Sequence, residues 1–337
     1  MSEFRQDPVT GIWMLLAPER AGRPHDLLRT PGESVDDGSC PFCAGREDMT
    51  PPTRWERSVP GEAAAWTVRV VENRWPALTS PDDADGSDDT GAPPPYRSTT
   101  GFGAHEVIIE TPRHGEGLAD YSPEHARLLV DAWSDRLRFW FADGRLACPM
   151  IFRNWGRAAG ASLAHAHTQL VVLPRVPEAI VRELGNFTGA ALSSSGCILC
   201  DAMAADDAGG RVVFDDGVTA AHVPFASPVP YSIRIAPRRC EPTIATMGPE
   251  SADSLASALV VCARAVRGTF GDAAFNLSVH VAPYTAMRVA GLPFHWHIDL
   301  IPRSTHFAGL EVGSGLYVNV VDPDRAAAEL RAGIGSR

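Results

Sequence analysis

The chain has 337 residues, of which 45% are hydrophobic and 21% charged, proportions that are ordinary for a globular enzyme of one large or two moderate domains. Its formal net charge of −11 argues against a nucleic-acid-binding surface, which is usually basic, but is compatible with a small phosphorylated substrate held by a few arginines. Because no apolar run reaches the roughly 18 residues of a membrane span and no signal peptide is recognisable, we expect a cytoplasmic protein without membrane contact.

The first half of the chain predicts an alternation of strands and a helix. Residues 79–95 are rich in Asp, Ser, Gly and Pro and predict a loop. A strand is expected over residues 105–110, after which Ser122 and Pro123 predict the N-cap and first residue of a helix with an apolar face. A strand near residues 149–154, a Gly/Ala turn and a strand over residues 165–173 complete this half.

The second half of the chain repeats this order of elements. Each signature returns at the matching place: a strand at 232–237, a helix start at 249–250, a Phe-Asn pair at 275–276, and a His-x-His at 295–297. Each half also contains one Cys-x-x-Cys pair. The repeat predicts two related α+β units, residues 1–175 and 176–337, fused through their sheets into one body.

The two Cys-x-x-Cys pairs indicate metal binding. Two thiolates at this spacing supply half of a tetrahedral zinc shell, although buried free thiols are the alternative. For the first unit the expected ligands are Cys40, Cys43, His114 and His165. For the second unit they are Cys197, Cys200, Cys240 and His295, with Cys240 in the place of His114.

The second metal site has a competing interpretation. His280, His295 and His297 could instead share a metal with a carboxylate such as Glu183. We prefer the thiolate set for this unit. The remaining cysteines, Cys148 and Cys262, lie in apolar sequence and are expected in the core.

The run His165-Ala166-His167-Thr168-Gln169 is the candidate catalytic segment. Alternation along a strand places both histidines on one face, so His165 can bind metal while His167 faces substrate. A neutral imidazole is a competent nucleophile toward phosphorus, and we expect His167 to play that part. Gln169 would donate an amide N–H to a phosphoryl oxygen, and Asn154 and Ser162 on flanking segments would add donors.

The corresponding run of the second unit carries an acid. Asp299 stands where the first unit has Gln169, and a carboxylate there would repel a phosphate. The sequence therefore predicts that only the first unit is catalytic.

Taken together, these motifs resemble the galactose-1-phosphate uridylyltransferase family of the histidine triad superfamily. The matching segments cover nearly the whole chain and are residues 5–13, 17–24, 40–43, 72–78, 154–169, 280–284, 294–297 and 308–311. Thr168 departs from the His-Pro-His-Gly-Gln pattern of the uridylyltransferases and looks more like the ADP-glucose phosphorylase and diadenosine polyphosphate phosphorylase branches. The resemblance implies two tandem histidine-triad-like units, each an antiparallel sheet with helices.

The resemblance also implies a double displacement and a set of substrate contacts. His167 would take a nucleoside monophosphate from a nucleotide sugar, release a sugar 1-phosphate, and pass the nucleotidyl group to a second phosphorylated acceptor. The implied contacts are Arg20 and Arg23 with phosphate, Asn73 and Trp75 with the nucleoside, Ser162 and Gln169 with the transferred phosphoryl group, and Glu311 with sugar hydroxyls. Members of the family are commonly homodimers with active sites near the subunit interface.

Two other functions are also compatible with the sequence. Phosphorolysis would use inorganic phosphate as the acceptor and release a nucleoside diphosphate. A zinc-stabilised nucleotide-binding protein without turnover would use the same residues for binding alone. The expected cofactors are Zn²⁺ in the first unit and Zn²⁺ or Fe²⁺ in the second.

Overall fold

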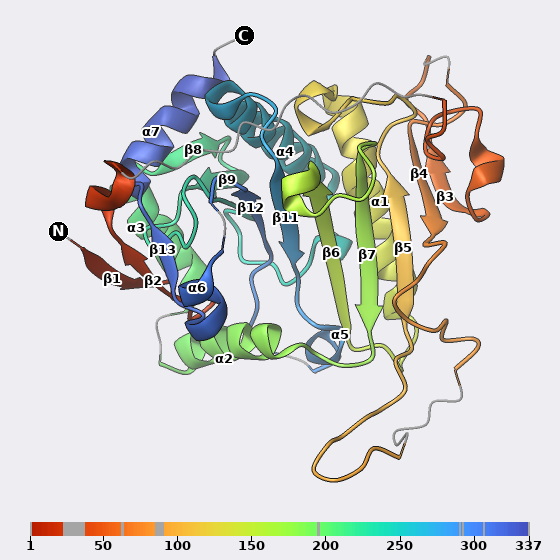
Figure 1. Ribbon diagram of the computed structural model, residues 1–337, viewed down its shortest axis with the longest axis horizontal. Helices are drawn as coiled ribbons and strands as arrows, with labels where there is room; N and C mark the ends of the chain where they lie inside the picture. The colour runs from red at the N-terminus through yellow and green to blue at the C-terminus, as the bar shows by residue number, and fades with distance from the viewer. Residues whose placement is uncertain are drawn as a thin grey trace.

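A computed structural model describes residues 2–22, 38–61, 64–84, 91–193, 196–289, 291, 293–305 and 307–335. Its centre is a ten-stranded sheet in which every pair of neighbouring strands is antiparallel (Figure 1). From one edge to the other the strands are β3 (Thr53–Arg57), β4 (Val68–Glu72), β5 (Ala104–Ile109), β7 (His167–Leu173), β6 (Cys148–Trp155), β11 (Phe275–His280), β12 (His297–Pro302), β10 (Ile233–Pro237), β9 (Thr219–His222) and β8 (Val212–Asp215).

The sheet is symmetric in strand order: from its middle to either edge, the five strands of one half follow the same sequence as those of the other. β6 and β11 are the two central strands, and β7, β5, β4 and β3 follow β6 as β12, β10, β9 and β8 follow β11. Helix α1 (Pro123–Phe141) precedes β6 in the chain, and helix α4 (Pro249–Phe270) precedes β11. The chain is thus an α+β protein whose two halves contribute equally to one continuous antiparallel sheet.

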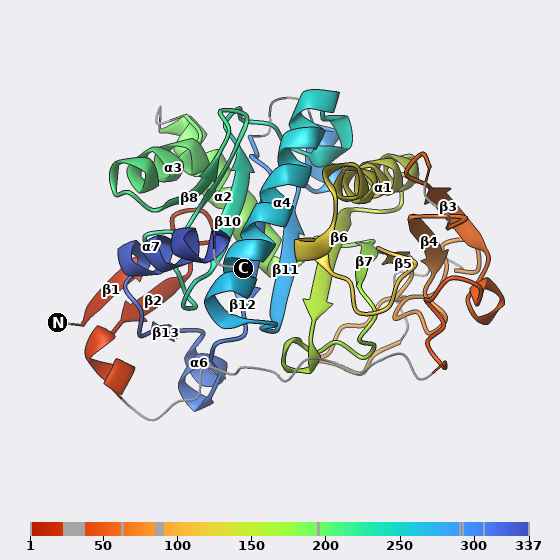
Figure 2. The ribbon, with the colours of Figure 1, turned by 90° about the horizontal axis from the view of Figure 1, so that it is seen from above.

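Helices α1 and α4 pack side by side on one face of the sheet (Figure 2). The predicted start of α1 is confirmed, since the Ser122 side chain accepts a hydrogen bond from the His125 N–H at 3.2 Å and Pro123 is the first helical residue. The buried apolar residues of both helices and of the sheet form one continuous core, to which Trp133 is a large contributor. Cys148 and Cys262 are buried, as expected.

The C-terminal helix α7 (Pro323–Ile334) crosses α4 at very short range. A Cβ atom added at Gly268 would lie 1.9 Å from the backbone oxygen of Gly333, so only glycine fits at this crossing. The N-terminal strands β1 (Glu3–Gln6) and β2 (Trp13–Leu16) form a separate small sheet with β13 (Tyr317–Asn319). Both ends of the described chain therefore pack on the half of the molecule that contains β12.

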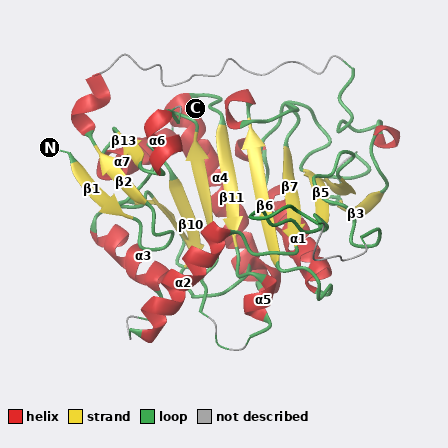
Figure 3. Ribbon diagram, turned by 60° about the horizontal axis from the view of Figure 1, so that its bottom comes forward, coloured by secondary structure: helices red, strands yellow, loops and turns green. Residues whose placement is uncertain are grey.

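The remaining four described α-helices are shorter than α1 and α4 (Figure 3). They are α2 (Glu178–Leu192), α3 (Ile198–Ala208), α5 (Tyr284–Met287) and α6 (Gly309–Ser314). Among the described helices, none combines the length and the hydropathy that a membrane span requires.

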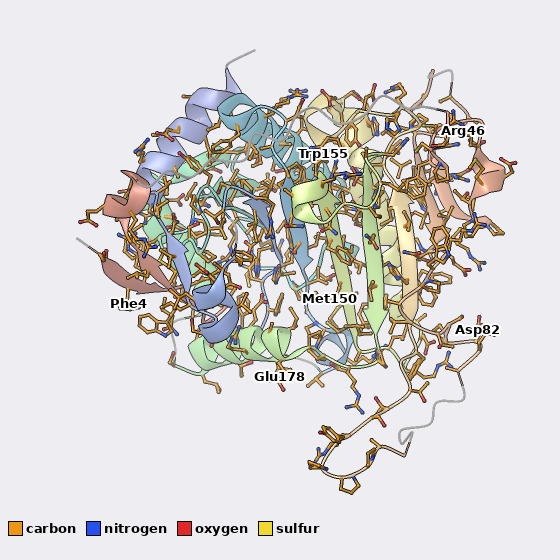
Figure 4. All side chains as sticks on the ribbon, in the orientation of Figure 1. Phe4, Arg46, Asp82, Met150, Trp155 and Glu178 are labelled. Atoms are coloured by element: carbon orange, nitrogen blue, oxygen red, sulfur yellow. The ribbon has the colours of Figure 1, made fainter. Side chains whose placement is uncertain are left out.

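Strand β7 shows how the sheet positions polar side chains. Leu170 and Val172 point into the helix-covered core, so His167 and Gln169 point to the opposite face. The strand begins at His167, whereas the sequence predicted a start at His165, which lies in the preceding bend. Figure 4 labels Met150 and Trp155 near the two ends of β6, and the end at Trp155 is the one beside His167.

Candidate active site and metal-binding clusters

The first predicted metal site comes together from three separated segments. The Sγ atoms of Cys40 and Cys43 each lie 3.5 Å from Nδ1 of His165, and Sγ of Cys43 lies 3.7 Å from Nδ1 of His114. Nε2 of His165 is 2.7 Å from the Thr111 carbonyl, an obligate acceptor, so the ring proton is on Nε2 and Nδ1 presents its lone pair to the thiols. Sulfur and nitrogen ligands of a tetrahedral zinc lie about 3.5 Å apart, so this cluster fits zinc.

The second thiolate cluster has the same design at the start of α3. Nδ1 of His295 lies 3.3 Å from Sγ of Cys197 and 3.5 Å from Sγ of Cys200, and its Nε2 lies 3.0 Å from the Pro237 carbonyl. The ligand atoms of Cys197, Cys200, Cys240 and His295 all lie within 4.8 Å of one another. A hydrogen bond from Cys240 is the main reason why the pKa of the Cys197 thiol lies far below its usual value, with His295 adding to the effect. Both predicted ligand sets are therefore compatible with metal binding.

The competing arrangement for the second site is divided by the structure. His295 belongs to the thiolate cluster, while Glu183, His280 and His297 form a separate group. Oε2 of Glu183 lies 3.0 Å from Nδ1 of His280, and Oε1 lies 3.4 Å from Nε2 of His297. The two imidazole rings stack with their centroids 4.5 Å apart. The alternative site with Glu183 therefore has only three of its four predicted ligands, because His295 faces the sulfurs of Cys197 and Cys200 instead.

The tautomer of His167, the first residue of β7, is set by a backbone carbonyl. Its Nδ1 lies 2.8 Å from the carbonyl oxygen of His165, so the proton is on Nδ1 and the lone pair is on Nε2. Burial lowers the pKa of His167 below its usual value, which keeps the ring neutral at neutral pH. In the described part of the chain, Nε2 of His167 has no hydrogen-bond partner and is not among the enclosed polar atoms.

The equivalent histidine of the second half of the chain, His297, has both ring nitrogens enclosed. His297 is completely buried, and its Nε2 faces Glu183 from α2. Burial lowers the pKa of His297 to about 4. Asp299 forms a two-point ion pair with Arg234, at 2.8 and 3.0 Å, and Arg234 also binds Asp7. The sequence predicted that Asp299 would repel phosphate, whereas in the structure its charge is paired and α2 covers this face.

Gln169 and Asn154, the amides predicted to bind the phosphoryl group, lie beside His167. Each is hydrogen-bonded to a residue that the sequence did not indicate as part of the site, His105 and Asn276 respectively. Oε1 of Gln169 lies 2.9 Å from Nε2 of His105 on β5. Oδ1 of Asn154 accepts a hydrogen bond from Nδ2 of Asn276 at 2.7 Å. The echo between Asn276 and Asn154 was visible in the sequence, but it did not indicate contact, since the pairing of β6 with β11 joins the two halves. Ser162 is exposed in the bend between β6 and β7.

The predicted nucleoside-binding residues follow β4 directly. Asn73 lies next to Gln169 through His105, because its Nδ2 is 3.0 Å from Nε2 of His105. A small cavity of about 70 Å³ is lined by Asn73, His105 and Trp140 among others. Trp75 is 79% exposed and does not line this cavity.

The predicted sugar contact Glu311 and the predicted phosphate contact Arg20 lie elsewhere in the chain. Arg20 is on the 3₁₀ helix η1 (Pro18–Gly22) and Glu311 is on α6, both beside the three-stranded sheet, whereas β7 lies in the other half (Figures 1 and 2). Oε2 of Glu311 accepts the Ala308 N–H at 2.9 Å at the start of α6. Arg23 lies outside the described residues. A single chain therefore does not bring Arg20 or Glu311 to His167.

Thr168, the residue that departs from the uridylyltransferase pattern, anchors the catalytic strand from behind. It points to the helix-covered face, where its hydroxyl donates to the buried carboxylate of Glu110. Glu110 also accepts from the Tyr121 hydroxyl at 3.2 Å and pairs with Arg153, so its charge is satisfied. The threonine thus contributes to the framework and not to the substrate face.

Comparison with known proteins gives the family. Residues 1–177 match the family described as galactose-1-phosphate uridyl transferase, N-terminal domain. An ADP-glucose phosphorylase from Arabidopsis thaliana is 30% identical over 334 residues, which cover 98% of this chain and 92% of the relative. A galactose-1-phosphate uridylyltransferase from Thermotoga maritima is 26% identical over 338 residues, which cover 98% of each. A crystal structure of an A. thaliana ADP-glucose phosphorylase with bound ADP-glucose has a TM-score of 0.84 and 29% identity, and the match covers 98% of this chain and 99% of that one. The chain therefore belongs to the galactose-1-phosphate uridylyltransferase family and shares features with its ADP-glucose phosphorylase branch.

Proposed function

We propose that this nucleotidyltransferase moves a nucleoside monophosphate from a nucleotide sugar to a sugar 1-phosphate through a covalent nucleotidyl-histidine at His167. The observation that carries the proposal is the free Nε2 of His167, whose lone pair follows from the hydrogen bond between Nδ1 and the His165 carbonyl. A nucleotide-binding protein without turnover would not need this tautomer or an open nitrogen. Catalysis is also supported by the two relatives, which are an ADP-glucose phosphorylase and a galactose-1-phosphate uridylyltransferase.

The first half-reaction follows from the position of the proton. Nε2 attacks the phosphorus that bears the nucleoside, an N–P bond forms, and the P–O bond to the leaving sugar 1-phosphate breaks. The ring then carries a positive charge, which the Nδ1–H to carbonyl hydrogen bond stabilises. In the second half-reaction a phosphate oxygen of the acceptor attacks the same phosphorus, the N–P bond breaks, and His167 returns to its neutral form.

The charge that develops on the non-bridging oxygens would be stabilised by neighbouring donors. Gln169 and Asn154 present amide N–H groups on the face of His167, and Ser162 can add a hydroxyl from the adjoining bend. Asn73 and Trp75 would hold the nucleoside on the far side of His105. These roles are carried over from the family pattern and are supported by the position of Asn73 and Gln169 around one histidine.

Phosphorolysis is the second candidate, in which inorganic phosphate is the acceptor. It is favoured by the ADP-glucose phosphorylase likeness, which has 30% identity against 26% for the uridylyltransferase from T. maritima. Incubation with UDP-glucose or ADP-glucose, each with galactose 1-phosphate or phosphate, separates the two by products. A new nucleotide sugar supports transfer, a nucleoside diphosphate supports phosphorolysis, and no product with any pair would contradict both.

The two thiolate clusters are proposed to hold Zn²⁺, with Fe²⁺ as the alternative at the second. The donor sets of two or three sulfurs with imidazole suit zinc, and the sulfur–nitrogen distances of 3.3–3.7 Å suit its tetrahedral shell. A metal held by Cys40, Cys43, His114 and His165 would fix His165, whose carbonyl sets the tautomer of His167. Its contribution is to structure, since His165 does not face substrate.

The chain is proposed to consist of two tandem histidine-triad-like units, residues 1–175 and 176–337. The mirrored strand order around β6 and β11 supports this division. We further propose a homodimer with active sites near the interface. Support comes from Arg20 and Glu311, which lie far from His167 within one chain and could complete the partner's site.

A further inference from the structure

Two side-chain amides of the site, Gln169 and Asn154, can act on a phosphoryl oxygen only in one of their two orientations. An amide group has an oxygen that accepts and a nitrogen that donates, and rotating it by half a turn exchanges them. The N–H end stabilises negative charge, whereas the oxygen end repels it. The hydrogen-bond network around each amide therefore decides which end of the amide faces the phosphoryl group. Each network includes a backbone N–H, which can only donate, or a backbone carbonyl, which can only accept, and this fixes the orientation.

The orientation of Gln169 follows from the backbone N–H of Ala77. This N–H lies 3.1 Å from Nδ1 of His105 and can only donate, so Nδ1 is the acceptor and the neutral ring carries its proton on Nε2. Nε2 is 2.9 Å from Oε1 of Gln169 and 3.0 Å from Nδ2 of Asn73. Oδ1 of Asn73 accepts the Trp75 N–H at 2.9 Å, so the Asn73 atom facing His105 is a donor.

The proton on Nε2 therefore has one acceptor, the oxygen of Gln169. The Asn73 NH₂ group already faces this N–H, so reversing the Gln169 amide would place a second NH₂ group beside it and remove the acceptor of the Nε2 proton. In the described part of the chain the NH₂ group of Gln169 has no protein acceptor. It is left free on the face that His167 shares.

The orientation of Asn154 follows in the same way from the carbonyl of Ala159. This carbonyl can only accept, and Nδ2 of Asn276 lies 2.9 Å from it, which fixes the Asn276 amide. The second hydrogen of the same Nδ2 goes to Oδ1 of Asn154 at 2.7 Å. Asn154 is thereby fixed with its oxygen toward the second half of the chain, and its NH₂ group has no acceptor among the described residues.

We infer that His105 and Asn276 are positioning residues that hold the amides of Gln169 and Asn154 with their N–H groups toward the transferred phosphoryl group. The inference rests on the proposed function, in which these two amides stabilise charge on that group. Asn276 belongs to β11, directly opposite Asn154 in the sheet, so the non-catalytic half of the chain takes part in positioning. His105 joins the same amide to the segment from Asn73 to Ala77.

The test is the rate of nucleotidyl-adduct formation in a single turnover, measured beside the Kd for the nucleotide sugar. His105→Phe removes the N–H that orients the Gln169 amide, and we expect a rate lower by about 10- to 100-fold, which is less than the roughly 100- to 1,000-fold cost of removing an oriented donor outright. His105→Gln returns an N–H near the position of Nε2 and should recover most of the rate. Asn276→Asp replaces a donor with an acceptor of the same shape, so Asn154 turns its N–H away from the site and the rate falls.

Double variants separate positioning from a general structural effect. In a Gln169→Ala background His105→Phe should slow the rate by less than about threefold further, because the amide it orients is gone. The same holds for Asn276→Asp in an Asn154→Ala background. His222→Phe, which removes a buried imidazole from β9, the strand next to the far edge of the sheet, serves as the matched control and should leave the rate unchanged.

Three outcomes would overturn the inference. Fold-changes that multiply in the double variants would assign His105 and Asn276 a role independent of the amides. A Gln169→Ala variant that forms adduct as fast as the wild type would remove the need for positioning. Absence of adduct in the wild type would instead overturn the proposed function itself, and the inference with it.

Discussion

At the scale of single residues, the site depends on groups whose polarity is fixed by neighbours. His167 has its proton on Nδ1 because the His165 carbonyl accepts it, and His165 has its proton on Nε2 because the Thr111 carbonyl accepts it. His165 and His167 thus present opposite nitrogens, Nδ1 of His165 toward the thiols and Nε2 of His167 toward the proposed substrate face. We therefore expect substitution of His167 and substitution of the metal-ligand residues to differ in their effects on turnover, zinc content and stability.

The nucleophile and the metal ligands should separate in a metal assay. His167→Asn is expected to abolish turnover and leave the zinc content unchanged, because its ring is not a ligand. Cys40→Ser is expected to lower zinc content and thermal stability together, because the ligand shell loses a thiolate. Elemental analysis and a melting curve of both variants check this, and equal zinc loss in the two would mean that the roles of His165 and His167 have been exchanged.

The buried carboxylate behind the catalytic strand should be important for stability. Glu110 pairs with Arg153, and both side chains are almost completely enclosed, so Glu110→Gln leaves a buried charge without its partner. We expect a loss of about 3–5 kcal/mol in the free energy of unfolding, measured by denaturant titration. Glu116→Gln, which breaks the exposed pair with Arg113, is the matched control and should cost at most about 1 kcal/mol. Similar losses in both variants would contradict the importance of the buried network.

At the scale of elements, the sequence predicted correctly those features that a short segment determines by itself, such as the start of a helix. The start of α1 follows from the capping Ser122 and from Pro123, and the start of α4 follows from the recurrence of Pro-Glu at residues 249–250. The convergence of Cys40, Cys43, His114 and His165 could be predicted because thiolates and imidazoles at that spacing have few other uses.

Features that depend on contacts between distant elements could not be predicted. The role of Asn276 requires the pairing of β6 with β11, and the covering of His297 requires α2 to place Glu183 on that face. The need for glycine at position 268 follows from the crossing of α4 with α7, which leaves no trace in local sequence. The roles of Asp299 and Thr168 were likewise decided by partners, Arg234 and Glu110, that lie far away along the chain.

The N-cap of α1 gives a prediction at this scale. Ser122→Ala removes the side-chain acceptor for the His125 N–H, and the expected cost is about 1 kcal/mol in the free energy of unfolding. Ser122→Asp retains an acceptor at the same place and should preserve stability. A thermal melt of the two variants checks the prediction, and an Ala variant as stable as the wild type would show that the cap contributes nothing.

At the scale of the whole molecule, the two halves of the ten-stranded sheet differ in the surroundings of their equivalent histidines, His167 and His297. Nε2 of His167 on β7 has no protein partner among the described residues, whereas His297 on β12 is completely buried and its Nε2 faces Glu183 of α2. The surroundings of His167 lack Arg20 and Glu311, which lie beside the small sheet. A partner subunit is the proposed source of these groups.

This proposal predicts complementation between two inactive variants. His167→Asn lacks the nucleophile and Glu311→Ala lacks the sugar contact, but a mixed dimer has one site with both wild-type residues. Mixing the two variants under conditions that exchange subunits should therefore restore activity, measured by product formation. If the mixture stays as inactive as its components while the wild type is dimeric, each site is built within one chain.

The central claim is a covalent nucleotidyl group on His167, and intact-mass measurement tests it most directly. After mixing with UDP-glucose or ADP-glucose without acceptor, the wild-type chain is expected to gain the mass of one nucleoside monophosphate, and His167→Asn is expected to gain none. The mass of the adduct also identifies the base that the site accepts. No adduct on the wild type with any donor, or an equal adduct on His167→Asn, would contradict the account.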